Sequence, residues 1–140
     1  FALTFPVGPN TLYDLPLQLN AAAAAGISTL DLVQIRRHIL RIQSLPSPIA
    51  LLAADVNRSG HLSAADLVAI TRVILRIDSQ FASVPNWNFL DVDFVNAHPD
   101  DLYEAIIENP NAGKPVINLQ EAGAIRIIAF KSGDADLSAK

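Results

Sequence analysis

The sequence predicts a mainly α-helical protein with a small β part, organised around two similar helices. The first observation is an internal repeat: residues 26–42 return as residues 61–77, with roughly ten of seventeen positions identical at an offset of about 35 residues. The second is the segment Asp55–Gly60, where oxygen-bearing side chains at alternate positions precede the second copy. The third is that runs with β character occur outside the repeat, toward the two ends of the chain.

Composition places the chain among globular proteins with a real core. It has 140 residues, of which 51% are hydrophobic and 17% are charged, so one domain with an apolar interior is expected. A net charge of −4 without clustered basic residues argues against a nucleic-acid or anionic membrane partner. There is no cysteine, which excludes disulfides, zinc–thiolate sites and thiol nucleophiles. No apolar run approaches the length of a membrane span.

Residues 1–19 are predicted to form an N-terminal β arm. Three prolines and a glycine interrupt short apolar runs there, and proline removes the N–H that a central strand needs. We expect edge-type strands at Ala2–Phe5 and Leu12–Leu17, joined by a turn at Val7–Asn10. Such an arm is either the end of a preceding β-domain or a strand used for assembly, and residues 20–140 form the main domain.

Each copy of the repeat predicts one amphipathic helix. The first should run from Ser28 to about Gln43, and the second from Ser63 to near Asp78. Both begin with a Ser-x-x-Asp capping box, whose aspartate also suits the positive end of the helix dipole. Helical spacing of apolar residues predicts two core-facing stripes, made of Leu32, Ile35, Ile39 and Ile42 in the first helix and Leu67, Ile70, Ile74 and Ile77 in the second.

Shorter elements are expected around and after the repeat. A brief apolar helix should lead into the second loop, and the rest of the chain alternates strands with one acid-capped helix. These predicted elements are a helix at Ile49–Ala54, a strand at Trp87–Val95, a helix at Asp100–Ile107, a turn at Asn109–Lys114, a strand at Val116–Leu119 and a buried strand at Ile125–Phe130.

The loop before the second helix has the donor spacing of a calcium site. Calcium takes roughly six to eight hard oxygens, and a twelve-residue loop supplies them from positions 1, 3 and 5, a carbonyl at 7 and a carboxylate at 12, with glycine at 6. These positions are Asp55, Asn57, Ser59, His61 through its carbonyl, and Asp66, with Gly60 at the turn. Two carboxylates predict weak binding, on the order of 10⁻⁴–10⁻³ M. The alternative is a polar turn that needs no ion.

A second site requires two separate segments to combine. The first copy keeps loop positions 7 to 12 but has Ala22 and Ala24 where oxygen ligands belong. Gly133–Ser138 has oxygens at alternate positions and no helix after them. We therefore predict a split metal site, completed within the chain or by the next molecule, from Gly26, Asp31, Asp134, Asp136 and Ser138. The alternative is a solvated acidic tail.

A motif in the second copy has the pattern Asp55-Val56-Asn57-x-Ser59-Gly60-x-Leu62-Ser63-x-x-Asp66-Leu67, and part of it is repeated in the first copy as Ile27-Ser28-x-x-Asp31-Leu32. This duplicated motif resembles the dockerin family. Dockerins are secreted bacterial modules with paired loop–helix calcium sites that dock onto cohesin partners. The resemblance covers residues 26–77 and implies an EF-hand-like helix pair. It further implies one or two calcium ions, an extracellular or cell-surface location, and a dockerin-like domain at 20–140 with a C-terminal β extension.

The resemblance also implies a partner-binding face. Dockerins usually present a Ser/Thr pair at loop positions 10 and 11 for cohesin contact, but this chain has Thr29-Leu30 and Ala64-Ala65 there. A standard cohesin partner is therefore not expected. Arginines lie where such helices carry contact residues, so a protein partner is predicted to meet Arg36, Arg37, Arg72 and Arg76.

The predicted function is a calcium-stabilised, extracellular, non-catalytic binding or assembly module. The alternative is a self-assembling subunit of an extracellular filament, linked head-to-tail through the N-terminal strand and the C-terminal half-loop. An enzyme is not expected, because no base partner or apolar setting accompanies the carboxylates of Asp91, Asp93, Asp100 and Asp101. No shared metal spacing links His38, His61 and His98.

Overall fold

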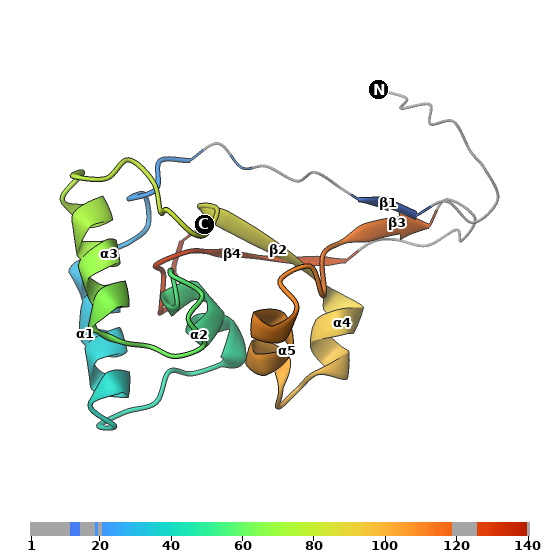
Figure 1. Ribbon diagram of the computed structural model, residues 1–140, viewed down its shortest axis with the longest axis horizontal. Coiled ribbons are helices and arrows are strands. Elements are labelled where there is room, and N and C mark those ends of the chain that lie inside the picture. The colour runs from blue at the N-terminus through green and yellow to red at the C-terminus, as the bar shows by residue number, and fades with distance from the viewer. Residues whose placement is uncertain (1–11, 15–18, 20, 119–125, 140) are drawn as a thin grey trace.

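The computed structural model describes residues 12–14, 19, 21–118 and 126–139. Figure 1 shows two helices packed side by side, a group of shorter helices beneath a two-stranded sheet, and a second strand pair set apart from the helices. The elements are β1 (Leu12–Asp14), α1 (Thr29–Ile39), α2 (Pro48–Ala54), α3 (Ala64–Ile74), β2 (Trp87–Asp91), α4 (Val92–Ala97), α5 (Leu102–Glu108), β3 (Val116–Asn118) and β4 (Ile127–Lys131). This architecture confirms the mainly α fold class with a small β part.

The repeat folds as the sequence predicted, with α1 and α3 in direct contact. Ser28 and Ser63 cap the two helices, and both halves of the capping box form, with Asp31 and Asp66 accepting from the cap backbone. Ile35 and Ile70, at equivalent positions of the two copies, are fully buried in one core cluster. The other buried members of this cluster are Ala23, Ile27, Ala54, Val56, Val73, Phe81, Val84 and Ala135.

Both helices end one turn earlier than predicted. Arg41 and Arg76 adopt the left-handed conformation, each with φ of 56°. The Ile42 N–H then donates to the Arg37 carbonyl and the Ile77 N–H to the Arg72 carbonyl, both at 2.9 Å, which closes a Schellman motif. The chain leaves the helix axis at this point, so the prediction that Ile42 and Ile77 extend the buried stripe is wrong. They are 69% and 59% exposed.

A second core cluster joins the short helices to the sheet. Leu52 and Ala53 of α2 pack against α5 and against the β2–β4 pair. Its remaining buried members are Leu90, Leu102, Tyr103, Ile106 and Phe130. Residues far outside the repeat therefore share a core with the helix that introduces the second loop.

Two antiparallel strand pairs make up the β part. β2 pairs with β4 from Trp87↔Lys131 to Asp91↔Ile127, and β1 pairs with β3 from Leu12↔Asn118 to Asp14↔Val116. Residues 12–14 of the predicted N-terminal arm thus join a strand of the main segment. Several predicted elements lie outside the described residues. They are the strand at Ala2–Phe5, the turn at Val7–Asn10 and residues 15–17 of the arm, together with Leu119 and Ile125 of the two later predicted strands.

Two strand predictions need correction. The run predicted as a strand over Trp87–Val95 is a strand only to Asp91, because the Asp91 carboxylate accepts from the N–H groups of Asp93 (2.8 Å) and Phe94 (3.2 Å) and so starts α4. The last strand runs over Ile127–Lys131 and is not fully buried, since Ala129 is exposed. No described helix has the length and apolar character needed to cross a membrane.

Candidate metal centre

The second loop folds back on the carboxylate of Asp55, which is fully buried at the end of α2. The N–H groups of Ser59 and Gly60 donate to its two oxygens at 3.1 and 3.0 Å. Arg58 and Gly60 turn the chain with positive φ values of 56° and 81°. Gly60 therefore occupies a position where only glycine avoids backbone strain, as the loop pattern predicted.

Asp66 closes the other end of the same loop and is also fully buried. One of its oxygens accepts from the Ser63 N–H at 3.0 Å, and the other accepts from the Asn57 N–H at 3.4 Å. Between these ends the Ser59 hydroxyl donates to the His61 carbonyl at 2.9 Å, so the predicted donors at positions 5 and 7 are adjacent. Hydrogen bonds thus connect all five residues predicted as donors within one turn.

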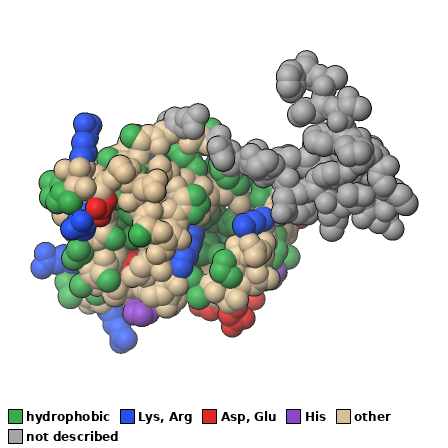
Figure 2. Space-filling view, turned by 45° about the horizontal axis from the view of Figure 1, so that its top comes forward, with side chains coloured by type: hydrophobic (Ala, Val, Ile, Leu, Met, Phe, Trp, Pro, Cys, Tyr) green, Lys and Arg blue, Asp and Glu red, His purple; other side chains and the backbone are tan. Residues whose placement is uncertain are grey.

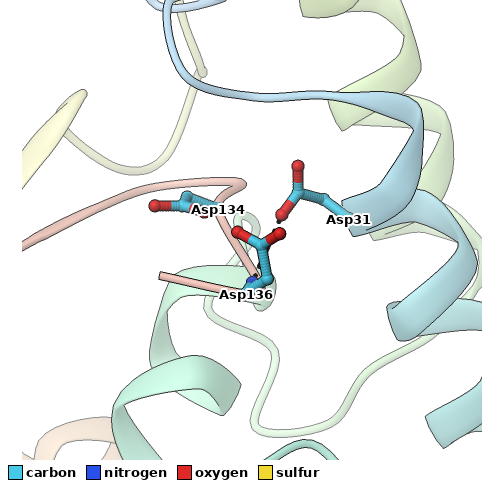
Figure 3. Close-up of side chains that lie close together, drawn as sticks. All are labelled: Asp31, Asp134 and Asp136. Carbon is cyan, nitrogen blue, oxygen red and sulfur yellow. Dashed lines mark hydrogen bonds between the residues drawn. The ribbon is translucent and has the colours of Figure 1, made fainter. Parts of the chain in front are cut away.

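The three aspartates predicted for the split site also lie close together, within a single chain. Asp31, at the start of α1, accepts from the main-chain N–H groups of Ala135 (2.9 Å) and Asp136 (3.3 Å). Figure 3 shows Asp31 on α1 and the other two aspartates on the segment that follows β4. Among the described residues, Asp31, Asp134 and Asp136 form a group whose carboxylate oxygens lie within 4.8 Å of one another. Two oxygens that share one calcium ion lie at most about 5 Å apart, so this donor set fits a single ion.

The C-terminal half-loop repeats the hydrogen bonds of the second loop. The Ser138 N–H donates to Asp134 (3.1 Å) and to Asp136 (3.0 Å), as the Ser59 N–H does to Asp55 (3.1 Å) and Asn57 (2.9 Å). Ala139 donates to Asp134 as Gly60 does to Asp55. Leu137 has φ of 57°, matching the 56° of Arg58. The segment 134–139 therefore has the same turn and hydrogen-bond pattern as the first half of the second loop, residues 55–60.

The two halves meet where a continuous loop would need its glycine. In the second loop Gly60 turns the chain from the first half into the second. In the split loop the equivalent residue is Ala139, and Gly26 begins the other half with φ of 76°. A Cβ added at Gly26 would lie 2.7 Å from the Cβ of Ala139, so the halves are in close contact. A chain that is interrupted at this point needs no glycine at position 6.

The electrostatics of the split site favour a cation. Asp31 and Asp134 are buried, and burial raises the pKa of Asp134 to about 6, with the neighbouring charge of Asp31 acting in the same direction. Hydrogen bonding from Ser138 lowers the pKa of Asp136. The buried side chain of Lys131 lies nearby, but its ammonium group donates to the Ala22 carbonyl at 3.1 Å. Buried carboxylates held by N–H donors are the hard ligands that calcium prefers.

Tyr103 and Arg58 belong to the surroundings of the second loop, and sequence reasoning missed both. The Tyr103 hydroxyl donates to Asp55 at 2.7 Å from α5, and burial raises the pKa of this tyrosine far above its usual range. The Arg58 guanidinium donates to the Leu52 carbonyl at 2.8 Å and to Asn88 at 3.1 Å, and burial lowers its pKa. No short-range pattern identifies a tyrosine that contacts Asp55 from 48 residues further along the chain.

The predicted partner-binding arginines are exposed: Arg36 and Arg37 lie on α1, Arg72 on α3, and Arg76 just beyond the end of α3. Arg72 makes a bidentate ion pair with Asp78, with distances of 2.6 and 2.9 Å. Figure 2 shows basic and hydrophobic side chains mixed on the face over these helices. The exposed apolar residues there recur at the repeat offset: Val33 and Val68, Leu40 and Leu75, Ile42 and Ile77, with Leu30 in the first copy.

Comparison with known families identifies the class of module. Residues 26–75 match the dockerin type I domain, and this match confirms the resemblance found in the repeat. Dockerin domains are non-catalytic modules that bind calcium and join proteins, so the match supports a calcium-binding, protein–protein assembly module in this segment. Comparisons with curated proteins and with solved structures gave no match. The half-loop at 134–139 lies outside the matched segment.

Proposed function

We propose that this chain is an extracellular, non-catalytic assembly module that calcium stabilises at two sites. One ion would be held by Asp55, Asn57, Ser59, the His61 carbonyl and Asp66, and the other by the Gly26 carbonyl, Asp31, Asp134, Asp136 and Ser138. The observation that carries the proposal is the shared hydrogen-bond pattern of segments 55–60 and 134–139, each facing a capping aspartate. Calcium supplies positive charge that offsets the cost of burying these carboxylates.

The two sites should differ in affinity. The split site has three aspartates and the continuous loop has two, and a larger ligand charge strengthens calcium binding. An ion at the split site would join Asp31 to Asp134, which are about 100 residues apart in the sequence. Calcium would therefore link the first helix to the segment after β4 as well as order a loop.

The partner is proposed to be a protein with an apolar and acidic surface. The support is the repeated set of exposed apolar residues beside Arg36, Arg37, Arg72 and Arg76. A groove of about 590 Å³ continues this face along α3, and its lining includes Val68, Arg72, Ile77 and Phe81. Hydroxyl pairs at loop positions 10 and 11 are missing, so a standard cohesin is not the proposed partner.

Counting bound calcium tests the proposal. Isothermal titration of the full chain should give two ions, and a chain that ends before Ser132 should give one, because it lacks Asp134, Asp136 and Ser138. Asp136→Ala is the gentler variant, since this residue is only half-buried. Asn96→Ala, on the exposed side of α4, is the matched control and should keep both ions. An unchanged stoichiometry after truncation would rule the split site out.

Head-to-tail filament assembly is the second candidate. A half-loop supplied by a remote segment can also complete the site of another molecule, and contacts of this kind that do not close give open polymers. The segment 134–139 contacts Asp31 of its own chain, which supports the single-chain arrangement. Size-exclusion chromatography with and without calcium separates the candidates: a monomer in both conditions supports the docking module, and calcium-dependent large species support the filament.

A further inference from the structure

One side chain of β2 connects the surroundings of the two candidate calcium sites. The side-chain oxygen Oδ1 of Asn88 accepts from the Arg58 guanidinium at 3.1 Å, and the side-chain nitrogen Nδ2 of Asn88 donates to the Ser132 hydroxyl at 2.9 Å. Arg58 is position 4 of the second loop, and Ser132 lies two residues before Asp134 of the split loop. A three-residue chain of hydrogen bonds therefore runs from one loop to the other.

Both ends of this chain are anchored. Arg58 is held in its left-handed turn while it donates to the Leu52 carbonyl at 2.8 Å. The Ser132 hydroxyl donates to the Pro85 carbonyl at 2.7 Å, so its proton is committed and it can only accept from Asn88. An asparagine at position 88 supplies one acceptor and one donor at once, and a rotated amide would lose both bonds.

A main-chain contact runs beside the side-chain connection. The Gly133 N–H donates to the Ala53 carbonyl at 2.7 Å, which places the residue before Asp134 against the helix that leads to Asp55. A Cβ at Gly133 would come within 2.8 Å of Ile27, at the start of the first helix's own half-loop. The three segments that supply calcium ligands therefore pack against one another next to Asn88.

We propose that Asn88 is a positioning residue that couples the two calcium sites, so that filling one raises the affinity of the other. This inference rests on the two sites of the proposed function. Calcium in the second loop restrains Arg58, and Asn88 passes this restraint to Ser132 and to the segment that carries Asp134. Because the segment that carries Asp134 is then already ordered, calcium binding at the split site loses less conformational entropy. The first ion thus raises the affinity for the second, which is positive cooperativity. The linkage is reciprocal for the two affinities.

The test measures a coupling factor. Each site has its own backbone reporter, because the Gly60 N–H contacts Asp55 and the Ala139 N–H contacts Asp134. The affinity of the split site is read from the Ala139 amide signal during calcium titration by NMR. The coupling factor is the ratio of this affinity in the parent to that in Asn57→Ala/Ser59→Ala, which removes two ligands from the second loop and leaves its capping aspartate in place. We expect a factor of at least about fivefold in the parent.

Breaking the connection at either bond should reduce this factor to below about twofold. Asn88→Ala removes both of its hydrogen bonds. Ser132→Ala removes the bond from the Asn88 amide and the bond to the Pro85 carbonyl but leaves the bond between Asn88 and Arg58, so this second variant keeps the test valid if the first does not fold. Asn96→Ala is the matched control for the side-chain change. Ile106→Val lowers stability in the second core cluster without removing either hydrogen bond of Asn88, and it should leave the factor unchanged.

The outcomes separate the two proposals. A factor that stays at the parent value in both Asn88→Ala and Ser132→Ala overturns the role of Asn88. Two responsive sites with a factor of one in the parent overturn coupling and leave the proposed function intact. An Ala139 signal that does not respond to calcium at all contradicts the split site itself, and the inference fails with it.

Discussion

At the scale of single residues, the buried carboxylates decide which contacts matter. Asp31, Asp55, Asp66 and Asp134 are all buried, although aspartate is rarely so unless it is paired. Main-chain N–H groups satisfy part of each carboxylate, and Tyr103 adds a side-chain donor to Asp55. The residues that reach these oxygens should therefore influence calcium affinity as well as stability.

Tyr103→Phe should weaken calcium binding at the second loop. The change removes a buried 2.7 Å hydrogen bond to Asp55 and leaves the packing of the ring intact. A hydrogen bond to a charged group contributes about 1.5–3 kcal/mol, so the free energy of unfolding should fall. The calcium affinity of the second loop, read from the NMR signal of the Gly60 amide during titration, should fall as well. Ile106→Val on the same helix should lower stability alone. Equal affinity in Tyr103→Phe and the parent would contradict this role.

Gly26→Ala should disturb the split site specifically. Residue 26 has φ of 76°, which costs roughly 1–2 kcal/mol for a residue with a Cβ, and the new methyl group would lie 2.7 Å from Ala139. Chemical denaturation should show this loss, and calorimetry should show one ion instead of two. Gly113→Ala provides the comparison, because residue 113 also has a positive φ (69°) but meets Phe94 instead of a loop residue. Loss of the second-loop ion in Gly26→Ala would argue against the assignment.

At the scale of secondary structure, the duplicated helix endings are the least expected feature. Sequence patterning predicted two stripes that continue to Ile42 and Ile77, but the Schellman motifs release both residues to the surface. The position that usually holds glycine holds Arg41 and Arg76. An arginine in a left-handed conformation costs free energy of folding. Of the two, Arg76 belongs to the predicted partner-binding residues, and binding a partner would explain why an arginine is kept there.

Arg41→Gly and Arg76→Gly should each stabilise the fold by about 0.5–1 kcal/mol, because glycine adopts φ near 56° without steric cost but loses more entropy on folding. Thermal unfolding in saturating calcium measures this gain. Only Arg76→Gly should reduce binding to the protein partner, since Arg76 and not Arg41 is among the predicted contact residues. A destabilised Arg41→Gly would show that the arginine side chain has a structural role.

At the scale of the whole molecule, calcium should act as a fold-stabilising ligand. At a calcium concentration about a hundredfold above Kd, each site adds about 2.7 kcal/mol to the free energy of unfolding. For a domain of this size that corresponds to roughly 10 °C in Tm per site. Chelation should therefore lower Tm markedly and in two steps if the split site is the tighter one. Identical melting curves with and without chelator would contradict the proposed function.

Local patterns determined much of this protein. The repeat, the Ser-x-x-Asp caps and the Asp55–Asp66 loop were readable in the sequence because capping, turn geometry and calcium ligation each depend on residues a few positions apart. The split loop was predicted from what each half lacked, since Gly26–Asp31 and Asp134–Ser138 supply complementary donors. Hydrophobic patterning gave wrong element ends where the chain changes direction. These places are Asp91, where the strand gives way to α4, and Arg41 and Arg76, where α1 and α3 end.

The tertiary structure alone decided how distant segments meet. Whether the half-loop after β4 contacts Asp31 of its own chain or of another depends on the β2–β4 pairing and on the shared core, which no local pattern encodes. The contacts of Tyr103 with Asp55 and of Asn88 with Arg58 and Ser132 likewise join residues at least 30 positions apart. Such contacts form only when the packed core brings their backbones within hydrogen-bond distance, so spacing in the sequence carries no signal for them.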